Sequence, residues 1–242
     1  MNTLHVMLSG VVGSTAYGLA GPDSDVDRLG IYAAPTMQLL GLHKVRESVV
    51  QHEPDVTMHE LGKFVRLALA GNPTVVELLW LPNELYETVT PLGFELMSMR
   101  SKLLSAPRVR DAYLGYATQQ FRRLESRGDG SFSADTRKRT AKHARHLARL
   151  LFQGYGLYAH GQLVVRLPAH QIERCRDLGV LAAAGDLDAV RRTLAAYEAN
   201  FNSVRSPLPD RPDTEFADTW LRNARRQLLS VEVPDVPGDD TD

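Results

Sequence analysis

The segment Asp25-Val26-Asp27, which follows the pair Gly13-Ser14 by eleven residues, is the feature that most constrains the fold of this chain. Apolar residues at 5–9 predict a buried strand that turns near Gly13, and a second strand is expected over 26–33. Because strand side chains alternate faces, Asp25 and Asp27 would point the same way and repel each other. Magnesium relieves such repulsion and prefers carboxylates plus substrate phosphates. The sequence therefore predicts a phosphate-handling metal site in an N-terminal α/β unit.

Gly13 and Ser14 are the expected phosphate-binding pair of this site. Glycine lets the backbone approach a phosphate closely, while backbone N–H groups and a hydroxyl donate hydrogen bonds to its oxygens. We expect Gly13 and Ser14 to hold the β- and γ-phosphates of a nucleoside triphosphate. Ser14 is also placed to cap a helical turn over residues 15–19.

A site with two metal ions usually needs a third carboxylate, and the candidates are Glu53 and Asp55. Asp55 is preferred because it begins an alternating run, over residues 55–59, that predicts a half-buried strand. If that strand lies beside the strand of Asp27, Asp55 completes the site and accepts the proton of the attacking hydroxyl. The alternative is that Asp55 is simply the first residue of a strand after proline.

The remaining pattern predicts mostly helices. A weaker strand is expected over 45–51, an exposed loop over 126–133, a short hairpin or extended arm over 161–166, and a disordered acidic segment over 233–242. The expected helices span residues 60–70, 74–80, 92–104, 108–125, 135–158, 168–177, 186–202 and 213–229. This order predicts an α/β (α+β) catalytic part over residues 1–90, a helical part over 91–204, and a linker, last helix and tail over 205–242.

Charge is unevenly distributed although the net charge is only −1. Residues 107–150 hold eleven Lys or Arg against four Asp or Glu, and residues 206–242 hold four Arg against nine acids. The basic segment is either a solvated helix face or a contact surface for phosphate or RNA. A single cysteine, Cys175, excludes an intrachain disulfide and favours the reducing cytoplasm. No long apolar run predicts a membrane span or a signal peptide.

The basic segment includes a stripe on one helix, because Lys138, Lys142, Arg145 and Arg149 recur at helical spacing. Such a stripe can neutralise a triphosphate or hold a nucleic-acid backbone, and the alternative is again a solvated face. His146 is expected to pack or to contact the triphosphate, since no nearby acid or cysteine completes a zinc site.

Two further residues stand out near the expected site. Glu77 lies in an otherwise apolar helical segment, and a buried carboxylate there is expected to have a partner. Tyr17 is expected to stack or pack beside the site. Asn72-Pro73 has the form of a helix start.

Gly13-Ser14, then Asp25-Val26-Asp27, then the later Asp55 resemble the DNA polymerase beta-type nucleotidyltransferase superfamily. The continuous wording of residues 13–32 resembles the small predicted nucleotidyltransferases of bacteria and phages, some of them associated with RNA repair. The resemblance covers roughly residues 7–170. Its other matches are Lys63-Phe64, Gly71-Asn72-Pro73-Thr74, Glu77-Leu78-Leu79, Lys142, His146 and Arg149-Leu150.

The resemblance implies a small mixed sheet with flanking helices, two magnesium ions, and transfer of a nucleoside monophosphate from a triphosphate. Gly13 and Ser14 match the phosphate-binding turn of that family, and Asp25, Asp27 and Asp55 match its metal-binding carboxylates. Two classes of acceptor stay open: an RNA 3′ end, or the hydroxyl of a protein or small molecule. A nucleotide-binding module without catalysis is the third alternative.

Overall fold

The computed structural model describes residues 4–22, 24–126 and 134–232. The loop expected over 126–133, apart from its first residue, and the segment expected to be disordered over 233–242 lie outside these ranges. No helix in the described ranges is both long and apolar enough to cross a lipid bilayer.

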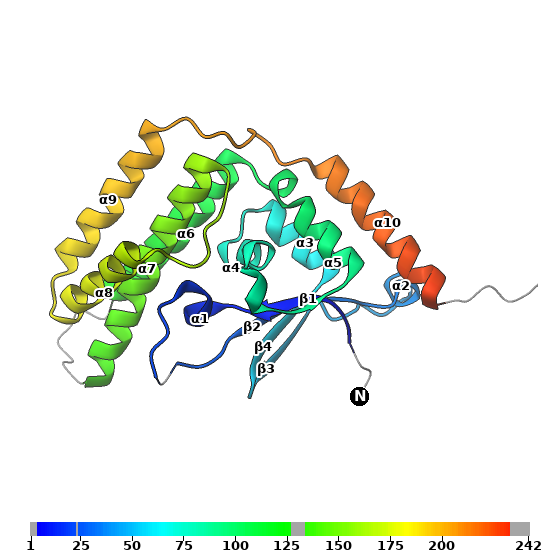
Figure 1. Cartoon of the computed structure of the whole chain (residues 1–242), viewed down its shortest axis with the longest axis horizontal. Helices are drawn as coiled ribbons and strands as arrows, with labels where there is room; N and C mark the ends of the chain where they lie inside the picture. The colour runs from blue at the N-terminus through cyan, green and yellow to red at the C-terminus, as the bar shows by residue number, and fades with distance from the viewer. Residues whose placement is uncertain (1–3, 23, 127–133, 233–242) are drawn as a thin grey trace, which may run out of the picture.

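A mixed sheet of five strands, in the order β3-β4-β2-β1-β5, forms the centre of the N-terminal part (Figure 1). Neighbouring strands are antiparallel except β2 and β4, which are parallel. This confirms the expected fold class of a small mixed sheet with flanking helices. The strands are β1 (His5–Val11), β2 (Arg28–Ala33), β3 (Ser48–His52), β4 (Asp55–Glu60) and β5 (Tyr86–Val89).

Two strand predictions need correction. The second strand begins at Arg28 rather than at residue 26, so Asp25 and Asp27 lie in the segment that leads into β2. The edge strand β5 was not predicted, because its four residues are too few to show a clear alternation. Residues 161–166 form no strand and take the form of the extended arm.

Helices account for most of the remaining described residues. The expected helix over 74–80 is divided into α4 and η1, and the one over 92–104 into α5 and η3. The elements are α1 (Gly13–Tyr17), α2 (Thr36–Leu39), α3 (Leu61–Leu69), α4 (Pro73–Val76), η1 (Glu77–Trp80), η2 (Asn83–Leu85), α5 (Pro91–Ser98), η3 (Arg100–Leu103), α6 (Ala106–Glu125), α7 (Ala134–His160), α8 (Ala169–Ala183), α9 (Leu187–Ser203) and α10 (Thr214–Glu232).

Side-chain caps explain several helix starts. Asn72 accepts hydrogen bonds from the N–H groups of Thr74 and Val75, and Pro73 occupies the first turn of α4, as expected for Asn72-Pro73. Ser14, in contrast, does not cap the first helix, because it lies inside α1 and the cap position is Val12. The carboxylate of Glu60 caps α3 by accepting from the N–H of Gly62.

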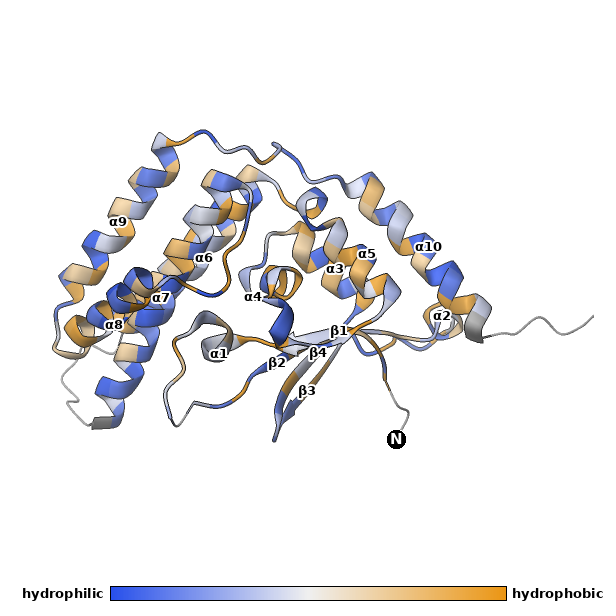
Figure 2. Cartoon of the chain, viewed as in Figure 1, coloured by the Kyte–Doolittle hydropathy of each residue, from blue (hydrophilic) through white to orange (hydrophobic). Residues whose placement is uncertain are grey.

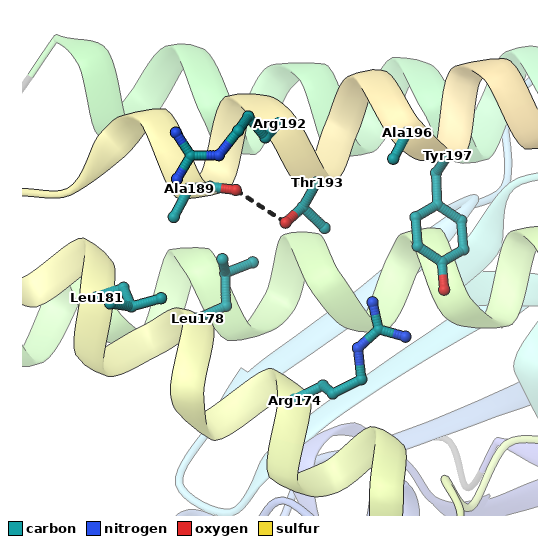
Figure 3. Close-up of a pocket in the computed structure, with 8 residues that line it drawn as sticks. All are labelled: Arg174, Leu178, Leu181, Ala189, Arg192, Thr193, Ala196 and Tyr197. Atoms are coloured by element: carbon teal, nitrogen blue, oxygen red, sulfur yellow. Dashed lines mark hydrogen bonds between the residues drawn. The ribbon is translucent and has the colours of Figure 1, made fainter.

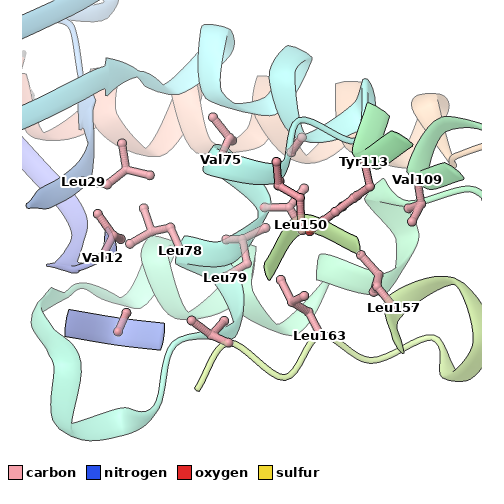
Figure 4. Packing of buried hydrophobic residues seen from close by; sticks show 14 of the residues in the cluster. Val12, Leu29, Val75, Leu78, Leu79, Val109, Tyr113, Leu150, Leu157 and Leu163 are labelled. Carbon is pink, nitrogen blue, oxygen red and sulfur yellow. The ribbon is translucent and has the colours of Figure 1, made fainter. Parts of the chain in front are cut away.

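One apolar cluster joins the sheet to the helical part (Figure 4). Val12 and Leu29 come from the N-terminal part, Leu78 from η1, and Tyr113 and Leu150 from α6 and α7. The helices α6, α7, α8 and α9 gather beside one end of the sheet, whereas α10 lies at the opposite side, next to α2 (Figure 1). The site described below is therefore held between the strands and the helix α7.

Candidate active site

Asp27 and Asp55 come together where two parallel strands begin. Arg28 of β2 is paired with Val56 of β4, so the residues just before them stand at the same end of the sheet. Neighbouring strands are about 5 Å apart, which places these side chains within reach of each other. The negative charge of Asp55 acts on the carboxyl group of Asp27. The structure therefore brings together two of the carboxylates that the sequence proposed for one site.

The pKa of Asp27 is raised above its usual range, first by partial burial and then by the negative charge of Asp55. Asp25 adds a further negative charge, while the ammonium group of Lys142 on α7 opposes the shift. Three carboxyl groups and one lysine thus act on the same small region, although Asp25 itself is exposed. Such concentrated negative charge is typical of sites that accept a cation.

A divalent metal ion fits the chemistry of this pair in part. Asp27 and Asp55 offer hard oxygen ligands, as magnesium prefers, and a cation between them would relieve the effect of each negative charge on the other. Within the described ranges, however, no group of three His, Cys, Asp or Glu side chains has the arrangement of a metal centre. The structure therefore brings together two candidate metal ligands, Asp27 and Asp55. Asp25 acts on Asp27 through its negative charge.

Gly13 lies directly against Asp27. Its φ of +67° is favourable for glycine, and a Cβ atom there would lie 2.0 Å from Oδ2 of Asp27. The N–H of Val12 also donates to the carbonyl oxygen of Asp27 at 2.9 Å. Any other residue at position 13 would displace the carboxylate. The backbone N–H of Gly13 acts on the carboxylate of Glu77 and opposes the rise of its pKa, so the half-buried Ser14 is the nearer candidate donor for a phosphate.

The stripe predicted on α7 passes from solvent into the core. Lys138 and Lys142 are exposed, Arg145 is half-buried, and the side chain of Arg149 is only 2% exposed. Arg149 is fully enclosed and contacts protein groups instead of solvent. The structure thus brings Lys142 to the carboxylates and places Arg149 behind them.

His146 is neutral in this environment. Burial, followed by the nearby charge of Arg149, lowers the pKa of His146 to about 3. Its Nδ1 atom lies 3.2 Å from Nη2 of Arg149, which donates to it, so the proton of the ring is on Nε2. His146 therefore packs against Arg149, one of the two roles expected from the sequence.

Glu77 has the partner that its apolar surroundings predicted. Its carboxylate, 1% exposed, lies 3.4 Å from Nη1 of Arg149 and 2.7 Å from the hydroxyl of Tyr17. Burial raises the pKa of Glu77 to about 7, against the opposing effects of Arg149 and Tyr17. The sequence did not identify Arg149 as the partner, although Arg149 also lies in an apolar run, Leu147-Ala148-Arg149-Leu150-Leu151.

A shallow groove of about 350 Å³ between α8 and α9 lies away from this site (Figure 3). Leu178, Leu181 and Ala189 form its apolar floor, and Arg174 and Tyr197 stand at one end. None of the clustered carboxylates lines it. The groove is therefore separate from the carboxylate cluster at Asp27.

The mixed sheet, with aspartates where β2 and β4 begin and a glycine turn against them, defines a nucleotidyltransferase of the DNA polymerase beta type. The family RlaP, described as the RNA repair pathway DNA polymerase beta family, matches residues 1–193, and the chain belongs to this family. The match stops before α10.

Among solved structures, the chain is similar to a nucleotidyltransferase-like protein from Exiguobacterium sibiricum 255-15. The two share 11% identity with a TM-score of 0.31, over 92% of this chain and 74% of the other. No curated protein matches the chain.

Proposed function

We propose that this protein is a magnesium-dependent nucleotidyltransferase that transfers a nucleoside monophosphate from a triphosphate to a hydroxyl group, that of an RNA 3′ end. The reaction releases pyrophosphate, as in enzymes of the EC 2.7.7 type. The observation that carries the proposal is the meeting of Asp27 and Asp55 beside the Gly13 turn and opposite Lys142. With one buried cysteine among the described residues, the reducing cytoplasm is the proposed compartment.

Each residue has a defined task in this reaction. Asp27 and Asp55 would hold magnesium with the assistance of Asp25, and the metal neutralises the charge that develops on the phosphate oxygens. Asp55 also favours removal of the proton from the attacking hydroxyl. Ser14 donates to the triphosphate, and Lys142 balances its charge. Positioning and charge neutralisation then supply most of the rate, as in phosphoryl transfer generally.

The cationic surface beside the site supports an RNA acceptor. The exposed cations of α6 and α7 make no ion pair with any described acidic side chain, and two of them, Lys142 and Arg123, both act electrostatically on His146. Figure 2 shows this hydrophilic character over the first half of α7. Unpaired cations in a row are suited to a phosphate backbone. Besides Arg108 near the start of α6, the exposed cations of these helices are Arg122, Arg123, Arg137, Lys138, Arg139 and Lys142.

The direct test uses magnesium, each of the four NTPs labelled at the α-phosphate, and RNA with either a free or an oxidised 3′ end. We expect label only on RNA with a free 3′ hydroxyl, and none with the variant D27N/D55N. Label on a protein or a small molecule would support the other acceptor class. NTP binding without transfer, in the presence of every acceptor, would favour a binding module.

A second test separates RNA from triphosphate binding. K138A removes a cation one helical turn from Lys142, and it should weaken RNA binding with a salt slope shallower by about 0.7, the value for one phosphate of single-stranded nucleic acid. K142A should also weaken NTP binding. The matched control is R226A on α10, at the opposite side of the molecule. An unchanged slope in K138A would assign Lys138 to a solvated face.

A further inference from the structure

Glu77 is a buried carboxylate to which the proposed reaction gives no direct task. It accepts a hydrogen bond from the hydroxyl of Tyr17 at 2.7 Å, and the backbone N–H of Gly13 acts on the same carboxylate. Gly13 and Tyr17 are the first and last residues of α1. One carboxylate therefore interacts with both ends of the short helix that begins with the expected phosphate-binding pair.

Arg149 contacts both Tyr17 of this helix and Glu77. Its guanidinium lies 4.2 Å from the centre of the Tyr17 ring and 3.4 Å from the Glu77 carboxylate. It also donates to Oε1 of Gln153 at 2.7 Å, and Gln153 donates to the carbonyl oxygen of Val165 in the extended arm at 2.8 Å. Because an arginine keeps its charge when buried, Glu77 is the counterion that this position requires.

The position of α1 in turn affects the position of the Asp27 carboxylate, because Gly13 lies against it. Gly13 contacts the carboxylate of Asp27, and its backbone N–H acts on the carboxylate of Glu77. A shift of Gly13 toward Asp27 would displace the Asp27 carboxylate, because there is no free space between them. A shift away from Asp27 would change the interaction with Glu77. The position of the turn is therefore set by its interactions with two carboxylates.

We propose that Glu77 and Arg149 are positioning residues of the nucleotidyl-transfer site. The Glu77 carboxylate holds the Gly13–Ser14 turn in the geometry that receives the triphosphate, and Arg149 supplies the charge that keeps this carboxylate in the core. This inference rests on the proposed function. Through Arg149 on α7, the helical part would affect the affinity for the nucleotide. Neither Glu77 nor Arg149 contacts the substrate in this proposal.

The test compares two variants that share the substitution R149M. E77Q/R149M keeps an oxygen that accepts from Tyr17 and interacts with the N–H of Gly13, whereas E77M/R149M fills a similar volume without a comparable acceptor. Replacing a buried ion pair by uncharged side chains of similar size is often neutral for stability, so both variants are expected to fold. Neither carries a charge at these positions, so the pair differs chiefly in the acceptor.

Three quantities are measured on the full chain: amide hydrogen exchange of residues 12–17 without nucleotide, the affinity for each NTP with magnesium, and kcat and KM for transfer. At equal Tm, we expect E77M/R149M to exchange faster at Gly13 and Tyr17 and to bind NTP about tenfold more weakly than E77Q/R149M, as for loss of one to two hydrogen bonds. Equal exchange and equal affinity in the two folded variants would overturn the inference.

Exchange also separates this inference from the proposed function. If the wild-type chain bound no NTP, the proposed function would fail, while the exchange of residues 12–17 would still show whether Glu77 holds the turn. If E77M/R149M did not fold, Y17F replaces it, since this variant removes one hydroxyl only. We expect faster exchange across α1 and about threefold weaker NTP binding in Y17F. Wild-type values for both would contradict the role of Glu77.

Discussion

Asp27 and Asp55 stand at the start of two parallel strands, where partial burial and then the negative charge of Asp55 raise the pKa of Asp27. Two neighbouring carboxyl groups repel each other when both are ionised. The fold keeps them together because the pairing of Arg28 with Val56 fixes the strands on which they stand. The repulsion between Asp27 and Asp55 thus reduces the stability of the folded chain at the place where negative charge is needed for the proposed reaction.

D27N should abolish transfer without unfolding the chain. The amide keeps the shape of the carboxylate and can donate a hydrogen bond to Asp55, while one of the repelling charges is lost, so Tm should stay equal or rise. Transfer should fall by at least about 100-fold, since loss of a metal ligand costs more than loss of a supporting contact. The control is D218N on α10, whose carboxylate pairs with exposed Arg222. A D27N enzyme with wild-type kcat/KM would remove Asp27 from the site.

Magnesium should stabilise the folded chain through the same pair. A ligand that binds only the folded state at 100 times its Kd raises the free energy of unfolding by about 2.7 kcal/mol. Thermal unfolding with saturating MgCl₂, compared with NaCl at equal ionic strength, measures this gain. D27N/D55N should show none of it. An equal gain in wild type and D27N/D55N would place the bound metal elsewhere.

Stability should depend on the protonation of His146 in mildly acidic solution. The pKa of His146 is lowered to about 3 in the folded chain, against 6.5 for an unperturbed histidine, so the unfolded chain binds the proton first. The contribution of His146 is therefore full above pH 6.5 and is lost as the pH falls toward 3, at up to about 1.4 kcal/mol per pH unit.

Glu77 has the opposite effect on the pH dependence of stability. Its pKa is raised to about 7, so its contribution to the free energy of unfolding grows as the pH falls from 7 to 4.5. The variant H146N isolates the histidine, since an asparagine oxygen can accept from Arg149 in place of Nδ1. Denaturant unfolding at pH 7 and pH 5 should show a smaller loss of stability at pH 5 in H146N than in wild type. The exposed His170 provides the control H170N. Equal losses in wild type and H146N would show that His146 accepts a proton in the folded chain.

The ion pair of Arg225 and Glu60 should anchor α10 to the sheet. Arg225 donates to the carboxylate of Glu60, which is 6% exposed and caps α3, and to the carbonyl oxygen of Ala34. R225M leaves the buried Glu60 without a counterion and should destabilise the chain by about 3 kcal/mol.

The control for α10 is R222M, which removes an exposed pair with Asp218 and should cost less than about 1 kcal/mol. Urea unfolding measures both variants. Equal effects in R225M and R222M would show that α10 is held by apolar packing alone.

Local pattern was enough to predict the elements that carry Gly13 and Asp27. The positions of Gly13 and Asp27 follow from a short apolar strand, a turn and a second strand, and each depends on neighbours within a few residues. Most helices were also predicted within a few residues of their observed ends, because their apolar spacing and caps are local. The class of protein could be inferred from these features, and the family match over residues 1–193 confirms it.

Only the tertiary structure decided which distant residues meet. Arg149 shares its helical stripe with Lys142, and periodicity alone did not reveal that the stripe enters the core and ends on Glu77. The parallel pairing that joins Asp27 to Asp55, the short edge strand β5 and the return of α10 to Glu60 likewise depend on segments far apart in the chain. Backbone propensity and side-chain periodicity act over a few residues, whereas burial and charge pairing are set by the packing of the whole chain.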